Sequence, residues 1–230
     1  MNVESLSLTS SYGATTAYVA RPQTEANTAI VLLQEYWGIN DHIRDLAGRY
    51  ATEGYLCVAP DLYRGRVAQD AAEASAMMQA LTLEDGLETI QKAIHGTKEA
   101  YNVHQFGITG YCMGGTYALR AACEISDLKA AAPFYGDIPE HELLKKLKVP
   151  TLFIAGKRDA WINEEKVNQL RSAAQKYDLP VEVIVYDADH AFFNDTRPQV
   201  YNAEAAADAW RRVLEHFRKY LSKGAAQAAS

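Results

Sequence analysis

A cysteine flanked by glycines is the side chain in this sequence best suited to act as a nucleophile. The segment Gly-Tyr-Cys-Met-Gly at residues 110–114 separates an apolar run that predicts a buried strand (106–109) from a run that predicts a helix (113–123). A nucleophile between two glycines at such a junction is typical of a sharp, strained turn that holds its central side chain out into a cleft. The turn also aims the backbone N–H of Met113 at the oxygen of a carbonyl under attack. We therefore interpret Cys112 as a nucleophile.

Two further side chains supply the partners that a thiol nucleophile needs. Asp159 follows the predicted strand 151–155 and His190 follows the predicted strand 181–186, so each lies in a loop at the carboxyl end of its strand. The order nucleophile, acid, histidine is that of the α/β-hydrolases. A neutral imidazole can accept the thiol proton, and a carboxylate on its far nitrogen fixes the tautomer. The sequence thus predicts attack of Cys112 on an ester or lactone carbonyl, a thioester, and its hydrolysis by water.

Other residues of the same types are weaker candidates for these roles. Three aspartates lie too near the histidine in sequence to reach around and orient its ring easily: Asp187, Asp189 and Asp195. The remaining histidines fall on helical or surface stretches, which favours a solvated or packed role: His42, His95, His104, His141 and His216. The two other cysteines are interpreted as small buried hydrophobes: Cys57 and Cys123.

The elements that must position these residues alternate along the chain. Strands are predicted at 3–8, 15–20, 28–34, 55–59, 106–109, 128–134, 151–155 and 181–186, the first two as a hairpin. Helices are predicted at 41–53, 68–81, 83–100, 113–123, 163–176 and 203–221. This alternation predicts an α/β fold, a mostly parallel twisted sheet with helices on both faces, whose ligands bind beyond the carboxyl ends of the strands. We expect one domain, 1–222, and a disordered low-complexity tail, 223–230.

Composition excludes several classes of function. The 230 residues are 48% hydrophobic, enough to bury one core, and a net charge of −6 disfavours a nucleic-acid surface. No apolar run is long enough to span a membrane, and the N-terminus lacks the regions of a secretory signal. Three cysteines without a Cys-x-x-Cys pair favour a reduced, cytoplasmic protein with neither disulfides nor structural zinc. We expect a small-molecule substrate and no metal or cofactor; the sequence carries no signal for the oligomeric state.

Over nearly its whole length the sequence resembles the dienelactone hydrolase (carboxymethylenebutenolidase) family of α/β-hydrolases. The resemblance is carried by Gln34-Glu35-Tyr36-Trp37-Gly38-Ile39-Asn40, Pro60-Asp61-Leu62-Tyr63, Gly110-Tyr111-Cys112-Met113-Gly114-Gly115, Asp159 and His190-Ala191-Phe192. It implies Cys112 as nucleophile, Asp159 as the residue that orients the histidine, and His190 as base. It further implies that Glu35 accepts a hydrogen bond from the resting thiol, and that the Tyr36 N–H is a second oxyanion donor.

Glu35 is also unusual when the family is set aside. It closes an apolar run, so it is expected to be partly buried, where a carboxylate needs a partner; a salt bridge at the end of the strand is the alternative explanation. Around these positions the candidate pocket residues are Trp37, Tyr63, Arg64, Trp161, Phe192 and Arg197. For Trp161, ordinary packing is an equal alternative.

The sequence departs from the family pattern in three respects. An Arg and a Tyr that bind the substrate carboxylate in the best-known member type are replaced here by residues such as Ala71 and Ser75. An Arg expected just after the histidine is replaced by Asn194, and Asp189 stands where many relatives have Gly. Three arginines could substitute, although a role as solvated surface residues is favoured for them: Arg64, Arg66 and Arg197.

The leading prediction is a cysteine-dependent hydrolase of small lactones or activated esters. The changes at the carboxylate-binding positions motivate a first alternative, a broader carboxylesterase or thioesterase with a different natural substrate. A second alternative, from another class, is a non-hydrolytic protein that binds or senses a small ligand in the same pocket.

Overall fold

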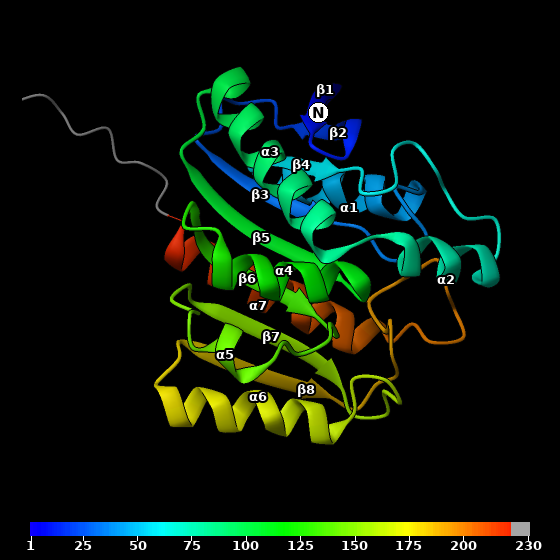
Figure 1. The fold of residues 1–230 in the computed structure, drawn as a ribbon, viewed down its shortest axis with the longest axis vertical. Coiled ribbons are helices and arrows are strands. Elements are labelled where there is room, and N and C mark those ends of the chain that lie inside the picture. Colours follow the sequence, from blue (N-terminus) through cyan, green and yellow to red (C-terminus); the bar gives the residue numbers. More distant parts are fainter. Residues whose placement is uncertain (222–230) are drawn as a thin grey trace, which may run out of the picture.

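Eight strands form one twisted sheet in this computed structural model, which describes residues 1–221 (Figure 1). The strand order is β1-β2-β4-β3-β5-β6-β7-β8. The bounds are β1 Asn2–Ser10, β2 Gly13–Arg21, β3 Thr28–Leu33, β4 Leu56–Pro60, β5 Gln105–Tyr111, β6 Leu128–Phe134, β7 Thr151–Gly156 and β8 Val181–Tyr186. β1 and β2 form the expected antiparallel hairpin, β2 is antiparallel to β4, and all the other pairs are parallel. The predicted α/β fold with a mostly parallel sheet is confirmed, whereas the predicted tail 223–230 lies outside the described residues.

Helices cover both faces of this sheet. They are α1 Asp41–Thr52, α2 Ala71–Ala80, α3 Leu83–Tyr101, α4 Met113–Glu124, α5 His141–Leu144, α6 Glu164–Tyr177 and α7 Ala203–Tyr220. In Figure 1, α3 and α4 pack together in front of the sheet and α7 lies behind it, where Trp210 contacts Tyr50 of α1 with ring centroids 4.7 Å apart. The sequence missed only α5, because a single turn is too short to show a helical period. None of the helices in the described chain has the length and apolar character to cross a membrane.

The central strands are buried because helices cover both of their faces. All six residues of β3 are buried, as is β5 from Phe106 to its end. A strand with two covered faces must be apolar throughout, which is why these segments show continuous apolar runs instead of alternation. Successive parallel strands end at the same edge of the sheet, so the loops after β3, β5, β7 and β8 meet there.

A side chain caps the start of most helices of the described chain, but not of α4 or of the single turn α5. Asn, Asp or Thr side chains accept a first-turn N–H at the start of five helices: Asn40, Asp70, Thr82, Asn163 and Asn202. At the start of α4 the corresponding residue is Cys112, whose side chain makes no such bond. The N–H groups that open α4 are therefore free to face a ligand.

The turn between β5 and α4 is strained in the way the glycines of the sequence indicate. Cys112 has φ +56° and ψ −116°, a combination that side chains rarely adopt and that costs about 1–3 kcal/mol. A Cβ atom on Gly110 would lie 2.3 Å from the carbonyl oxygen of Gly114, and one on Gly114 would lie 2.4 Å from that of Leu33. Backbone from β3 and α4 thus approaches the turn too closely for any side chain but hydrogen.

We expect Gly110→Ala to lower the free energy of unfolding by about 3 kcal/mol, because the new methyl group meets fixed backbone. Gly96→Ala in α3 is the matched control. Its Cβ would lie 3.4 Å from a Leu6 methyl carbon, an ordinary contact, and alanine favours a helix by roughly 0.5–1 kcal/mol over glycine. Urea denaturation of both variants measures the difference. Equal midpoints would contradict the close approach at Gly110.

Candidate active site

The carboxylate of Asp159 and the imidazole of His190 are joined by a short hydrogen bond at the carboxyl edge of the sheet. Asp159 lies in the loop after β7 and His190 in the loop after β8, and Oδ2 of the acid is 2.6 Å from Nδ1 of the ring. The other oxygen, Oδ1, accepts the backbone N–H groups of Trp161 and Ile162, each at 2.8 Å. Three contacts therefore fix the buried carboxylate and direct one oxygen at the ring.

This contact fixes which nitrogen of the ring carries a proton. Burial alone would raise the pKa of Asp159, but the hydrogen bond and charge of His190, with the N–H groups of Ile162 and Trp161, lower it below its usual value. An ionised carboxylate can only accept, so Nδ1 of His190 must be the protonated nitrogen. The other nitrogen, Nε2, is left with a free lone pair that can take a proton.

The thiol of Cys112 is nearly buried and holds its proton at neutral pH. The residue is 8% exposed. Burial, and next to it the charge of Glu35, raise the pKa of the thiol to about 12, although the N–H of Met113 acts to lower this pKa. Among residues 1–221, Sγ makes no hydrogen bond to His190 or to Glu35. The hydrogen bond from the resting thiol to Glu35 that the resemblance implied is therefore not present among these residues, whereas a contact between a nucleophile and its base is often open in a free enzyme. A thiol that keeps its proton needs a nearby base to become a good nucleophile.

Glu35 is buried and has no cationic partner within ion-pair distance in the described chain. Its residue is 2% exposed, and Oε2 accepts a hydrogen bond from Nδ2 of Asn194 at 2.7 Å. Burial raises the pKa of Glu35, while the Asn194 hydrogen bond and the charges of Arg197 and His190 oppose that rise without cancelling it. The alternative expectation of a strand-end salt bridge is not what the structure shows: a neutral amide is the partner.

A cavity of about 260 Å³ brings these groups together. Its lining is Glu35, Tyr36, Trp37, Met78, Cys112, Trp161, His190, Ala191 and Arg197. These residues come from the loops after β3, β5, β7 and β8 and from α2, so the cavity lies where a parallel sheet is expected to bind ligands. Larger hollows exist, such as one of about 420 Å³ at the opposite ends of β7 and β8, but its lining includes neither Cys112 nor His190.

Aromatic and apolar side chains form most of the cavity wall. The Trp161 and His190 rings have centroids 5.3 Å apart, and those of Tyr36 and Trp37 are 4.6 Å apart. Met78 projects from α2 and was not among the residues predicted from sequence. A methionine pair in a helix otherwise rich in alanine is the signal that could have indicated it.

Comparison with known proteins identifies the family of this chain. The sequence profile described as "Dienelactone hydrolase family" matches residues 15–221. The chain belongs to the dienelactone hydrolase family. A Salmonella typhimurium protein named "Putative carboxymethylenebutenolidase" is 33% identical over 226 residues, which cover 90% of this chain and 83% of that protein. An Aquifex aeolicus protein of the same name is 30% identical, with 89% of this chain and 93% of that protein covered.

Solved structures share the whole fold of this chain. The crystal structure of a "Putative Dienelactone Hydrolase" from Klebsiella pneumoniae superposes with a TM-score of 0.87 at 31% identity, covering 95% of this chain and 99% of that one. A dienelactone hydrolase-like promiscuous phosphotriesterase from metagenomic libraries has a TM-score of 0.88 at 19% identity, covering 95% and 98%. The second likeness shows the α/β-hydrolase fold alone. The family match itself supports a hydrolase of the dienelactone hydrolase kind.

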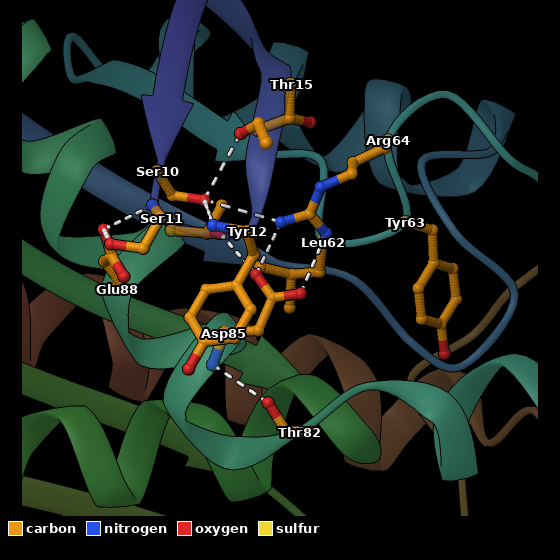
Figure 2. A network of polar contacts seen from close by, with 12 residues as sticks. Ser10, Ser11, Tyr12, Thr15, Leu62, Tyr63, Arg64, Thr82, Asp85 and Glu88 are labelled. Atoms are coloured by element: carbon orange, nitrogen blue, oxygen red, sulfur yellow. Dashed lines mark hydrogen bonds and ion pairs between the residues drawn. The ribbon is translucent and has the colours of Figure 1, made fainter.

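Arg64, a candidate for replacing the family's carboxylate-binding residues, points away from the cavity. Its guanidinium bonds both oxygens of Asp85 on α3, at 2.9 and 2.6 Å, and reaches Oγ of Ser10 in the β1–β2 hairpin (Figure 2). The Asp61 carboxylate accepts the N–H groups of Tyr63 and Gly65, which curls the loop and leaves Arg64 at φ +52°. This turn in the backbone directs the side chain toward α3.

Two other predicted pocket residues also lie outside the cavity lining. Tyr63 is buried, and its hydroxyl donates to Sδ of Met113 at 3.1 Å, so it contacts the first residue of α4. Phe192 is fully buried against the rings of Tyr135 and Tyr186. Of the six candidate pocket residues, the structure therefore places three at the cavity: Trp37, Trp161 and Arg197. Arg66, the remaining possible substitute, pairs with Glu73.

The rival acids are engaged elsewhere. Asp187 and Asp189 both contact the guanidinium of Arg158, at 2.6 and 3.2 Å. Asp195 pairs with Arg49 of α1, and its other oxygen lies 3.4 Å from Nδ1 of the buried His42. Asp159 is thus the carboxylate that contacts His190 within the described chain, and His42 is packed in the core as expected.

Proposed function

We propose that this chain hydrolyses small lactones or activated esters through a thioester on Cys112, with His190 as base and Asp159 as the residue that orients it. One observation carries the proposal: the hydrogen-bonded Asp159–His190 pair opens onto the same cavity as the thiol at the strained turn. The established family membership is consistent with hydrolysis, and the chemistry of these three side chains supplies the route.

In the first half of the proposed reaction, Nε2 of His190 takes the thiol proton as Sγ attacks the carbonyl carbon. The carbonyl oxygen becomes an oxyanion, which the N–H groups of Tyr36 and Met113 stabilise. Neither N–H donates a loop or turn hydrogen bond to the backbone within residues 1–221, so both are available. The carbon–oxygen bond then breaks, the leaving alcohol takes the proton from His190, and a thioester remains; from a lactone, this alcohol stays attached.

In the second half, His190 removes a proton from water, which attacks the thioester. The second oxyanion collapses, the acid leaves, and the sulfur regains its proton from the imidazolium. Asp159 stabilises the imidazolium in both halves. Glu35 acts as an auxiliary group beside the sulfur, because an ionised Glu35 raises the pKa of the thiol and a neutral one does not.

The proposal is tested by trapping the intermediate. We expect a brief pulse of p-nitrophenyl acetate, stopped with acid, to leave an acetyl group on the peptide that contains Cys112, together with a burst of nitrophenol. Peptide mapping by mass spectrometry locates the group. Acetyl on a different residue would refute the assigned nucleophile. Absence of both adduct and product would instead favour the alternative of a protein that binds a ligand without hydrolysing it.

A broader carboxylesterase or thioesterase is a second candidate, because the cavity wall is largely apolar. Met78 and the two tryptophans line it, whereas Ala71 and Ser75 on α2 do not. Arg197 instead favours the hydrolase of anionic lactones. It lines the cavity and makes no ion pair within the described residues, so it is free to bind an anionic substrate. The two candidates are separated by kcat/KM for an anionic dienelactone and for a neutral aryl ester, in the wild type and in Arg197→Met.

A further inference from the structure

The loop that carries His190 also holds the partner of Glu35. Asn194 in this loop is 1% exposed. Its Nδ2 donates to Oε2 of Glu35 at 2.7 Å, and its Oδ1 accepts from both the N–H and the hydroxyl of Thr196, at 3.0 and 2.6 Å. A backbone N–H can only donate, so Oδ1 must face Thr196 and the donor nitrogen must face Glu35. The amide is therefore locked in one orientation by its own loop.

The same loop is anchored on its far side to α1. Asp195, the next residue, pairs with Arg49 and lies beside His42. Consecutive side chains thus point in opposite directions, Asn194 toward Glu35 and Asp195 toward α1. This double attachment fixes the position of Asn194 relative to the sheet edge from which Glu35 extends.

Several titratable or charged groups surround the Glu35 carboxyl. They are Tyr36 on the same loop, Cys112 at the turn, Tyr135 after β6, and His190 and Arg197 on the loop after β8. Within residues 1–221, however, only Asn194 forms a hydrogen bond to the carboxyl oxygens. A donor to a carboxylate favours its ionised form, and this donor is neutral, so it cancels none of the carboxylate's charge. That charge is felt by the thiol, whose pKa it raises.

We propose that Asn194, locked by Thr196, is a positioning residue that holds Glu35 beside Cys112 and stabilises its ionised form, thereby restraining the thiol. The inference rests on the auxiliary role proposed for Glu35. The thiol is restrained while Glu35 is ionised, and anything that weakens the Asn194 contact widens the pH range in which Glu35 is neutral and the thiol is easier to deprotonate.

The test is the pH dependence of Cys112 alkylation by iodoacetamide, followed by peptide mapping so that Cys57 and Cys123 are counted separately. In the wild type, the logarithm of the rate should rise with pH, flatten where Glu35 ionises, and rise again. In Asn194→Leu the flattening should move up by about one to two pH units, because a hydrogen bond to a charged group is lost. Thr196→Val should move it less, because the backbone N–H still holds Oδ1.

Two controls separate positioning from a loss of stability. Glu35→Gln should remove the flattening altogether. Asn202→Ala deletes a half-buried asparagine that caps α7 and does not face Glu35, so it should lower Tm without moving the flattening. A flattening that stays in place in Asn194→Leu while Tm falls would overturn the inference, as would its absence from the wild type. If Asn194→Leu does not fold, Thr196→Val tests the inference instead, and a flattening that stays in place in that variant would overturn it.

Alkylation needs no ester hydrolysis, so the two proposals fail separately. A shifted flattening in a protein that forms no acetyl adduct would leave the Asn194 inference standing and remove the proposed function. An acetyl adduct on Cys112, together with a flattening that does not move in Asn194→Leu, would support the proposed function and overturn the Asn194 inference.

Discussion

Replacing Cys112 by alanine is expected to lower kcat for p-nitrophenyl acetate by at least about 10⁴-fold, because the base and the oxyanion donors remain but no atom can form the acyl intermediate. The fold should persist, since the turn depends on Gly110 and Gly114 and not on the sulfur. Initial rates of nitrophenol release, measured with Tm on the same preparation, give the result.

Cys123→Ala is the matched control for that substitution. Cys123 is 7% exposed against 8% for Cys112, and burial raises the pKa of its thiol to about 12 as well. It lies at the other end of α4 and is absent from the lining of the cavity that holds His190. Equal burial with unequal activity would show that position, not thiol chemistry alone, makes the nucleophile. Full turnover in Cys112→Ala would remove the proposed mechanism.

Asp159→Asn should lower kcat by about 10⁴-fold while leaving the shape of the site intact. Oδ1 of residue 159 must still accept the N–H groups of Trp161 and Ile162, so the new amide nitrogen has to face Nδ1 of His190. Two donors cannot face each other, and the ring proton therefore moves to Nε2. The nitrogen nearest the cavity then carries a proton and cannot accept one from the thiol.

The control for the asparagine variant is Asp187→Asn, which alters an exposed carboxylate paired with Arg158. Its kcat should match the wild type, because surface ion pairs of this kind contribute roughly 0–1 kcal/mol and this one does not touch His190. The kcat of both variants, measured across pH, distinguishes the loss of the His190 tautomer that is protonated at Nδ1 from a general electrostatic effect. A wild-type rate in Asp159→Asn would mean that His190 is oriented by something other than Asp159.

The elements of the fold followed from the sequence because their signals are local. Continuous apolar runs indicated the buried strands, and the helical segments between them followed from the alternation of the two patterns. The elbow was visible locally as Gly-x-Cys-x-Gly, although part of the backbone that requires its glycines belongs to the distant residue Leu33. The single turn α5 was missed because a helix that short has no period to detect.

The residues that line the cavity were predicted less well, because a residue lines the cavity only if its side chain points into it. Phe192 belongs to a motif of the resemblance and Arg64 directly follows another, yet Phe192 turns into the core and Arg64 toward Asp85. Met78 faces the cavity although α2 is exposed along most of its length. Which way a side chain points depends on the loop or helix that carries it, and that depends on distant contacts such as the Asp61 carboxylate holding the backbone at Gly65.

Sequence alone determined the strand–helix alternation, the position of Cys112 at a strained turn, and the order in which an acid and a histidine follow it, since each depends on neighbours in the chain. The sequence favoured Asp159 over its rivals, and the tertiary structure places it against His190. Tertiary structure alone decided that Glu35 is held by a neutral amide and that Arg197 makes no ion pair within the described chain. The physical reason is distance in sequence: Asn194 and Glu35 lie 159 residues apart, and only folding brings such groups within reach of a hydrogen bond.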